Sequence, residues 1–188
     1  MALTTLDPKT ALLVIDLQNG ILALPASRRV DEVISRAGEL ADAFRGHGLP
    51  VVLITVAGAP SGRTEQRRRG GQQRPVGWAD LVPGLNQQPG DHTVTKRTWG
   101  AFTNTDLAEH LRGLEVTQVV IVGVATSIGV ESTARHAHEH GLNVTLAVDA
   151  MTDSDPEAHA NSVARIFPRL GETGTTREII DLLDCTRS

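Results

Sequence analysis

The sequence has little cysteine and few aromatic residues, and both shortages exclude classes of protein. Its single cysteine, Cys185, has no partner in the chain, so neither an internal disulfide nor a cysteine-based metal site can form. Tyrosine is absent, and only two Trp and three Phe occur, which argues against a platform of aromatic side chains for stacking nucleic-acid bases. The core must therefore be built from Leu, Val, Ile and Ala.

A strong excess of charge and long apolar runs are also missing. The net charge is -4 over 188 residues, which fits neither a disordered segment nor a nucleic-acid binder with a basic face. The first ten residues lack the features of a secretory signal, and no run approaches the roughly 20 apolar residues of a membrane span. We expect a cytoplasmic protein that binds a small-molecule substrate, with no nucleic-acid or membrane partner, and a single domain over residues 1–188.

Continuous apolar segments alternate with segments of helical periodicity. Apolar runs of this kind are typical of parallel strands that are covered on both faces. They lie at residues 11–15, 51–56, 118–122 and 144–148. A further short strand is expected at 92–95, before Lys96. Helical spacing is found at residues 30–44, 106–112, 129–140, 156–167 and 177–183. Because strands that alternate with helices form right-handed crossovers, the sequence predicts a doubly wound three-layer α/β/α fold with a mostly parallel central sheet.

One long segment, residues 58–90, interrupts this alternation. It is rich in Gly, Pro, Arg and Gln and contains three consecutive arginines, Arg67 to Arg69. We expect this segment to form a loop over the surface, with the three arginines in contact with solvent. Loops of this length tend to be functional or mobile. One short piece of it should pack against the body of the protein through Trp78, Leu81, Val82 and Leu85.

Two charged residues stand at the ends of predicted strands. Ligands of open parallel sheets bind beyond the carboxyl ends of the strands. Asp16 ends the first strand in VIDLQNG, and Lys96 follows the run 92–95 in VTKRTWGAF. At one edge of the sheet each charge would hold the other ionised. The alternatives are a turn or cap residue for Asp16 and a solvated pair with Arg97 for Lys96.

A third candidate site is the turn GVATSIGVESTAR, residues 123–135, where a strand runs into a helix through small and hydroxyl residues. Unpaired backbone N–H groups at such a helix start attract an anion or a developing oxyanion. Capping of the helix by Thr126 or Ser127 is the simpler explanation, and it is compatible with anion binding.

The order and spacing of DLQNG, VTKRTWGAF, GVATSIGVESTAR and VTLAVDAMTD resemble the isochorismatase-like (cysteine hydrolase) superfamily. The resemblance covers residues 11–183. In the amidases of this superfamily a pocket holds Asp as the general base, Lys as its support, and Cys as the nucleophile that attacks a carbonyl. Asp16 and Lys96 match the first two, and the position of the cysteine falls on Gly129.

Glycine at this position removes the nucleophile of the amidase reaction. Ser127 and Ser132 lie two residues upstream and three downstream of it, so neither should project from the same point, and thioester chemistry is not expected. Isochorismatase resembles this chain in having glycine there, and its aspartate protonates a vinyl ether to which water then adds. The resemblance therefore implies a hydrolase of a small organic molecule that uses Asp16 and Lys96 in non-covalent general acid/base catalysis. Burial would have to raise the pKa of Asp16 against the lowering effect of Lys96.

The resemblance implies further properties of the site. A cis peptide bond would fall between Val124 and Ala125, and the chain would form a homo-oligomer, a dimer or larger. Isochorismatases place a glutamine after the second strand, whereas residues 56–58 are VAG here, which argues against isochorismate as the substrate. The residues predicted to bind substrate are Gln18, Phe102, Ala125, Thr126, Ser127 and Ile128.

Neither a cofactor nor a metal is expected. Nicotinamidases of the superfamily hold a metal with an Asp-x-His pattern after the second strand, and residues 57–90 contain no histidine. His136 and His140 have a spacing that can hold a metal on one helix face, although an exposed polar face is the simpler interpretation. The alternative to an enzyme is a catalytically silent member that binds a small molecule, since loss of a triad nucleophile costs about a million-fold in rate.

Overall fold

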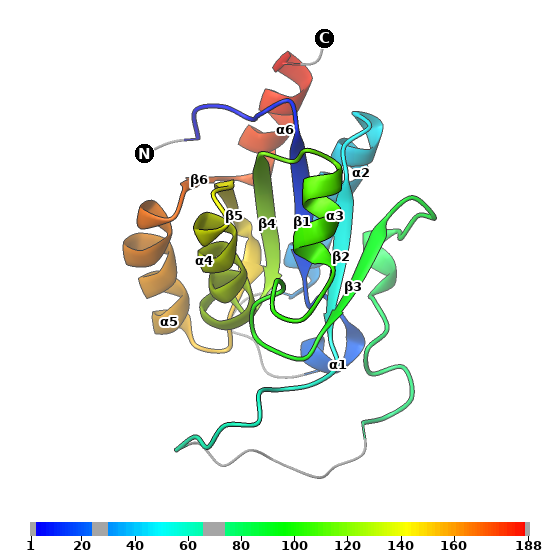
Figure 1. The fold of residues 1–188 in the computed structure, drawn as a ribbon, viewed down its shortest axis with the longest axis vertical. Coiled ribbons are helices and arrows are strands. Elements are labelled where there is room, and N and C mark those ends of the chain that lie inside the picture. The colour runs from blue at the N-terminus through cyan, green and yellow to red at the C-terminus, as the bar shows by residue number, and fades with distance from the viewer. Residues whose placement is uncertain (1–2, 24–29, 66–73, 187–188) are drawn as a thin grey trace.

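The protein, described by a computed structural model, is built on a six-stranded sheet in which every pair of neighbouring strands is parallel. The structure describes residues 3–23, 30–65 and 74–186. The strands are β1 (Thr10–Ile15), β2 (Val51–Val56), β3 (His92–Lys96), β4 (Gln118–Val124), β5 (Asn143–Thr152) and β6 (Glu172–Gly174). Helices cover both faces (Figure 1), which confirms the predicted fold class.

In the strand order β3-β2-β1-β4-β5-β6, the direction in which successive strands are added to the sheet reverses between β1 and β4. The chain first moves from β1 outward to β3 and then returns to β4, on the other side of β1. The carboxyl ends of β1 to β5 lie at the lower end of the sheet in Figure 1, opposite the two chain termini, whereas β6 pairs only with residues 145–147 of β5. In doubly wound sheets this switch point is where ligands bind.

Two hydrophobic clusters attach the helices to the two faces of the sheet. The helices are α1 (Asn19–Leu22), α2 (Val30–Gly46), α3 (Leu107–Gly113), α4 (Glu131–Glu139), α5 (Pro156–Asn161) and α6 (Thr176–Thr186). Alternate residues of β1 divide between the clusters: Leu12 and Val14 pack with α2 and α6, whereas Leu13 and Ile15 pack with α3 and α4. Figure 1 shows α3 and α4 in front of the sheet and α2 behind it.

The predicted elements differ from the structure mainly at their ends. The helix predicted over 156–167 is α only up to Asn161 and continues as a π-helical turn, Ser162–Ile166. The short strand β6 was not predicted, because three residues that pair only with β5 carry no apolar run of their own. β5 also extends to Thr152, past an irregularity in its pairing with β4.

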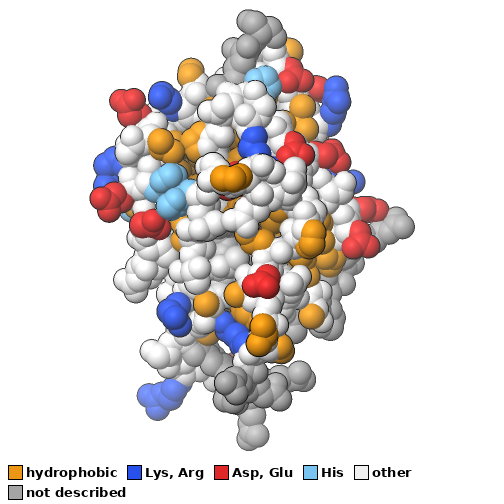
Figure 2. All heavy atoms as spheres, turned by 90° about the vertical axis from the view of Figure 1, so that its right-hand side faces the viewer, with side chains coloured by type: hydrophobic (Ala, Val, Ile, Leu, Met, Phe, Trp, Pro, Cys, Tyr) orange, Lys and Arg blue, Asp and Glu red, His pale blue; other side chains and the backbone are white. Residues whose placement is uncertain are grey.

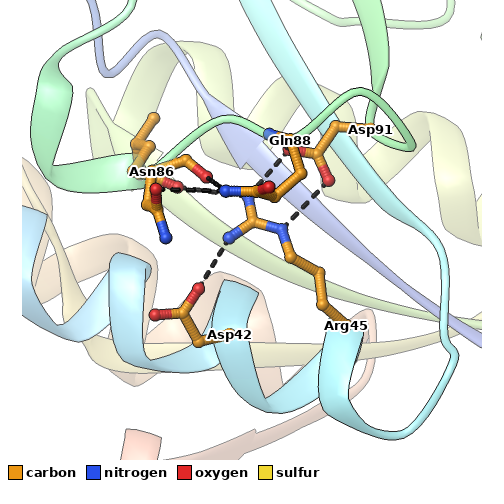
Figure 3. A network of polar contacts seen from close by, with 6 residues as sticks. Asp42, Arg45, Asn86, Gln88 and Asp91 are labelled. Carbon is orange, nitrogen blue, oxygen red and sulfur yellow. Dashed lines mark hydrogen bonds and ion pairs between the residues drawn. The ribbon is translucent and has the colours of Figure 1, made fainter.

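A network around Arg45 of α2 anchors the segment that leads into β3 (Figure 3). Its guanidinium group donates hydrogen bonds to both carboxylate oxygens of Asp91, at 3.1 and 2.8 Å, and to Asp42 at 2.8 Å. It also donates to the carbonyl oxygen of Leu85, at 3.1 Å. Leu85 is fully buried, as predicted, and so fixes the end of the 58–90 segment. Arg67 to Arg69 lie outside the described residues.

The face of the molecule along the β3 edge carries mixed charges. In Figure 2 acidic and basic side chains are interspersed there, and no basic stripe of the kind that binds a phosphate backbone is visible on the coloured part of that face. No helix in the part of the chain that the structure describes combines the length and the apolar character needed to cross a membrane.

Candidate functional site

The structure brings Asp16 and Lys96 together at the carboxyl end of the sheet. Asp16 directly follows β1, and Lys96 is the last residue of β3, two strands away. The lysine side chain is long enough to cross the end of β2, so that Nζ donates a hydrogen bond to Asp16 Oδ2 over 2.7 Å. Nζ also contacts the carbonyl oxygen of Thr98 at 3.3 Å. The pair is buried: Asp16 is 5% exposed and Lys96 is 1% exposed.

Burial makes the carboxyl group of Asp16 a weaker acid than an exposed aspartate. Loss of hydration raises its pKa to about 6, although the charge of Lys96 and the hydrogen bond from it act in the opposite direction. The second oxygen, Oδ1, is buried and has no hydrogen-bond partner among the described residues. The backbone of Asp16 has a φ of 52°, which aspartate tolerates better than most residues. Asp16 can therefore carry a proton close to neutral pH and can present it on one free oxygen.

The turn after β4 places Gly129 directly beside this carboxyl group. At the start of this turn the peptide bond between Val124 and Ala125 is cis, as the resemblance predicted. The chain then continues as a π-helical turn, Thr126–Val130, before α4. A Cβ atom built on Gly129 would lie 3.2 Å from Asp16 Oδ2. A side chain at position 129 would thus meet the Asp16 carboxyl group, and glycine leaves that space open.

A buried hydroxyl group ties this turn to the loop that follows Lys96. Thr133 Oγ1 donates a hydrogen bond to the carbonyl oxygen of Gly129 at 2.7 Å and accepts one from the N–H of Ala101 at 3.1 Å. Thr98 of the same loop donates to the carbonyl oxygen of Gly100 at 2.9 Å. The glycine and the lysine are therefore held by one connected set of hydrogen bonds.

The start of the helical segment is already capped by a carboxylate of the protein. Asp153, which follows β5, accepts hydrogen bonds through Oδ2 from the N–H of Ser127 at 2.7 Å and from its hydroxyl at 2.8 Å. The expectation that this helix start holds a substrate anion therefore needs correction, because Asp153 occupies the N–H of Ser127. The alternative of capping by Thr126 or Ser127 is also wrong, because their hydroxyl groups bond His159 and Asp153, and the N–H of Ser127 is bonded by Asp153 instead.

A cavity of about 310 Å³ opens in front of the Asp16–Lys96 pair. It lies at the carboxyl ends of β1, β3, β4 and β5, where the switch in strand order between β1 and β4 predicts a ligand site. Apolar and small residues form much of its wall, which is usual for small-molecule sites. The lining residues include Asp16, Lys96, Gly129, Ala125, Ile128, Val56, Arg74, Trp78, Trp99, Thr152 and Asp153.

The six residues predicted to bind substrate fall into two groups. Ala125 and Ile128 lie in the cavity wall. Phe102 does not line it, because its ring packs against His140 on another part of the surface, with centroids 5.0 Å apart. Thr126 is fully buried behind the turn, where its hydroxyl pairs with Nδ1 of His159 at 2.9 Å.

Gln18 and Ser127 are also outside the cavity wall, because their polar groups are engaged elsewhere. Ser127 is bonded to Asp153, as described above. The side chain of Gln18 accepts a hydrogen bond from the N–H of Val56 at 2.7 Å and donates to the carbonyl oxygens of Val56 and Trp78, at 3.1 and 3.3 Å. Gln18 thus organises the cavity wall and does not line it.

Gly20, the last residue of the motif DLQNG, is explained by the position of Trp78. A Cβ atom on Gly20 would lie 2.0 Å from the indole Nε1, so only glycine leaves room for this ring. The guanidinium carbon of Arg74 lies 3.9 Å from the centre of the same ring. Neither Arg74 nor Trp78 was predicted to line the cavity, since the 58–90 segment carries no periodic signal that relates it to the strand ends.

The histidines of the HAHEH segment are separate from the cavity. His140 packs on Phe102, and His136 lies against Gly100, where a Cβ atom would meet its ring at 2.6 Å. Among the residues that the structure describes, no group of three or more His, Cys, Asp and Glu side chains is arranged to hold a metal ion.

A doubly wound sheet with a buried aspartate–lysine pair and a cavity at its switch point defines an α/β protein with a candidate small-molecule site. Comparisons with known proteins show its family. The isochorismatase domain family matches residues 10–178. The isochorismatase family protein YwoC of Bacillus subtilis is 41% identical over 179 residues, covering 92% of this chain and 93% of its own. YecD of Escherichia coli O157:H7, of the same family, is 39% identical over 181 residues, covering 93% and 96%.

Solved structures lead to the same family. An isochorismatase family protein from Burkholderia thailandensis is 40% identical and superposes with a TM-score of 0.91, covering 96% of this chain and 98% of its own. The chain therefore belongs to the isochorismatase family.

Proposed function

We propose that the protein hydrolyses a small organic molecule, an enol ether or a related compound, by general acid/base catalysis without a covalent intermediate. The observation that carries the proposal is the state of Asp16: a buried carboxyl group with a pKa of about 6 and one unpartnered oxygen, in the wall of a 310 Å³ cavity. General acids work best when their pKa lies near the operating pH. Homo-oligomer formation and a cytoplasmic location stay predictions.

The reaction begins with a proton transfer from Asp16. The protonated carboxyl group gives its proton to the vinyl carbon of the substrate, which leaves a cation on the carbon that bears the ether oxygen. Water adds to that cation and returns a proton to the Asp16 carboxylate. The resulting hemiketal then breaks its C–O bond to the leaving group, so that one vinyl ether and one water yield one alcohol and one ketone.

Lys96 and Gly129 serve this route in different ways. Lys96 keeps the pKa of Asp16 from rising further and stabilises the carboxylate once the proton has left. Gly129 fits a reaction without a nucleophile, because the space beside Asp16 Oδ2 is left to the substrate. With the helix start occupied by Asp153, a carboxylate on the substrate would bind at Arg74, the cation stacked on Trp78 in the same wall.

The direct test is an assay of the purified protein on isochorismate and on a panel of vinyl ethers and amides. We expect turnover of at least one vinyl ether and no turnover of amides. Binding of a vinyl ether by calorimetry without turnover of any compound would instead support the alternative of a catalytically silent binding protein.

The pH profile of the reaction should report the protonated form of Asp16. Because only that form donates a proton, we expect kcat/KM to be constant at low pH and to fall tenfold per pH unit above about 6. The measurement is kcat/KM between pH 4.5 and 9 on the best substrate of the panel. A profile that rises with pH over this range would show that Asp16 acts only as a base.

Gly129→Cys tests the position assigned to this residue. The new side chain starts 3.2 Å from Asp16 Oδ2, so it should block vinyl ether turnover by about 100-fold or more. Its thiol, beside Lys96 and an acceptor carboxylate, should react with iodoacetamide about tenfold faster than the exposed Cys185. The two thiols are distinguished by mass spectrometry of peptides. Normal turnover together with an inert thiol would place residue 129 away from the reacting atoms.

A further inference from the structure

The cavity wall contains a second buried oxygen atom that lacks a hydrogen-bond partner among the described residues. It is the hydroxyl oxygen of Thr152, at the end of β5, and the residue is 1% exposed. A buried polar group without a partner costs about 1–3 kcal/mol, and the great majority of such groups are paired. Because Thr152 lines the cavity, a ligand or water bound there is a candidate partner for this hydroxyl group.

The register of the sheet places the backbone of Thr152 level with that of Asp16, on the other side of β4. Thr152 pairs with Val124 of β4, and Ile15, the residue before Asp16, pairs with Gly123 on the other side of β4. Neighbouring strands are about 4.8 Å apart. The backbones at Asp16 and Thr152 are therefore about 10 Å apart across β4, and both residues line the same cavity.

Packing alone does not explain a threonine at this position. Valine has nearly the same shape and would avoid the unpaired hydroxyl group. The adjacent Asp153, in contrast, has a structural role, since it bonds Ser127 and the N–H of Asp155. The hydroxyl group of Thr152 is thus the polar group of this strand end that has no hydrogen-bond partner in residues 3–23, 30–65 and 74–186.

We propose that Thr152 holds the water molecule that adds to the cationic carbon. This inference rests on the proposed function and adds to it a catalytic residue that contacts a reacting atom. Thr152 Oγ1 accepts a hydrogen bond from the water, so that a lone pair of the water oxygen faces the carbon that Asp16 has made cationic. As the new C–O bond forms, the water's second proton goes to the Asp16 carboxylate, and the ether C–O bond breaks in the following step.

The test compares Thr152→Val with Thr152→Ser. On a vinyl ether that the wild type hydrolyses, valine should lower kcat by about 100-fold because the water loses its fixed position, with little change in KM. Serine retains the hydroxyl group and should restore kcat to within a few-fold of the wild type. Thr145→Val is the matched control: it removes a buried hydroxyl group on the same strand, one bonded by Gln118 at 3.0 Å and remote from the cavity. It should lower stability and leave kcat unchanged.

Competition with methanol separates a role in holding water from a general loss of structure. The ratio of methanol adduct to hydrolysis product should rise several-fold in Thr152→Val and stay at the wild-type value in Thr145→Val. An unchanged ratio together with an unchanged kcat would overturn the proposal.

A structural readout decides the water site even if the proposed function fails. Should the wild type turn over no vinyl ether, high-resolution crystal structures of the wild type and of Thr152→Val still test the site. An ordered water on Thr152 Oγ1, absent from the valine variant, supports the inference. A wild-type structure in which no water or ligand oxygen contacts that hydroxyl group contradicts it.

Discussion

Replacing Asp16 with asparagine is expected to lower kcat/KM for vinyl ether hydrolysis by about 10³- to 10⁴-fold. The amide has nearly the shape of the carboxyl group but cannot deliver a proton, so the vinyl carbon would depend on water for protonation. Binding of the substrate should persist, because the cavity wall is otherwise intact. Single-turnover kinetics and a calorimetric binding constant measure the two effects separately.

The matched control for this variant is Asp91→Asn. Asp91 is also a buried carboxylate in an ion pair, with its side chain 3% exposed, but its partner is Arg45, outside the cavity wall. Its replacement should reduce stability while the rate stays near that of the wild type. If Asp16→Asn retained more than a tenth of the wild-type rate, proton donation by Asp16 would be excluded.

The second large effect is expected from Lys96→Met. An opposite charge in contact lowers a carboxyl pKa by roughly one to three pH units, and Lys96 supplies that influence on Asp16. Without the lysine, burial acts alone, and the pKa of Asp16 rises above 6. The descending limb of the pH–rate profile should therefore move to higher pH by about one unit or more, which a profile of kcat/KM against pH measures directly.

Stability should change with pH in the same variant. In the wild type the pKa of Asp16 is 3.8 when unfolded and about 6 when folded. The proton thus favours the folded state, and this contribution, about 3 kcal/mol, is complete below pH 3.8 and lost as the pH rises through 6. In Lys96→Met the loss extends to higher pH, because an ionised Asp16 would be buried without a partner.

Denaturant titrations at two pH values measure this loss. We expect Lys96→Met to be destabilised by roughly 3–5 kcal/mol at pH 8 and by clearly less at pH 5, where Asp16 takes up a proton. Arg45→Met, which breaks a buried ion pair outside the cavity wall, should show no shift in the pH–rate profile. Equal destabilisation of Lys96→Met at both pH values would argue against a coupled Asp16–Lys96 pair.

Several parts of the site could be predicted from the sequence because their signals are local. A polar residue that stops an apolar strand in a parallel sheet must lie at the carboxyl end of that sheet, and both Asp16 and Lys96 satisfy this rule. The turn around Gly129 likewise follows from a strand that runs into a helix. The positions of Asp16, Lys96 and this turn can therefore be predicted from hydrophobic periodicity and the direction of the chain alone.

Other parts could not be predicted, because they depend on which segments meet in space. Gln18 follows the same strand as Asp16 and looked equally available, yet its amide is occupied by Val56 and Trp78. Trp78 reaches the cavity from a loop without periodicity. Thr152 is brought to the cavity by the pairing of β5 with β4, which sets its backbone level with that of Asp16.

The layered α/β architecture and the edge of the sheet at which chemistry is expected follow from the amino-acid sequence alone, because apolar periodicity and chain direction are properties of neighbouring residues. The contact of Lys96 with Asp16 across β2 and the bond of Asp153 to the N–H of Ser127 could be seen only in the folded chain. Tertiary structure also decided that the pKa of Asp16 rises to about 6. Strand order, side-chain reach and loss of hydration are set by residues far apart in the chain, and no local pattern records them.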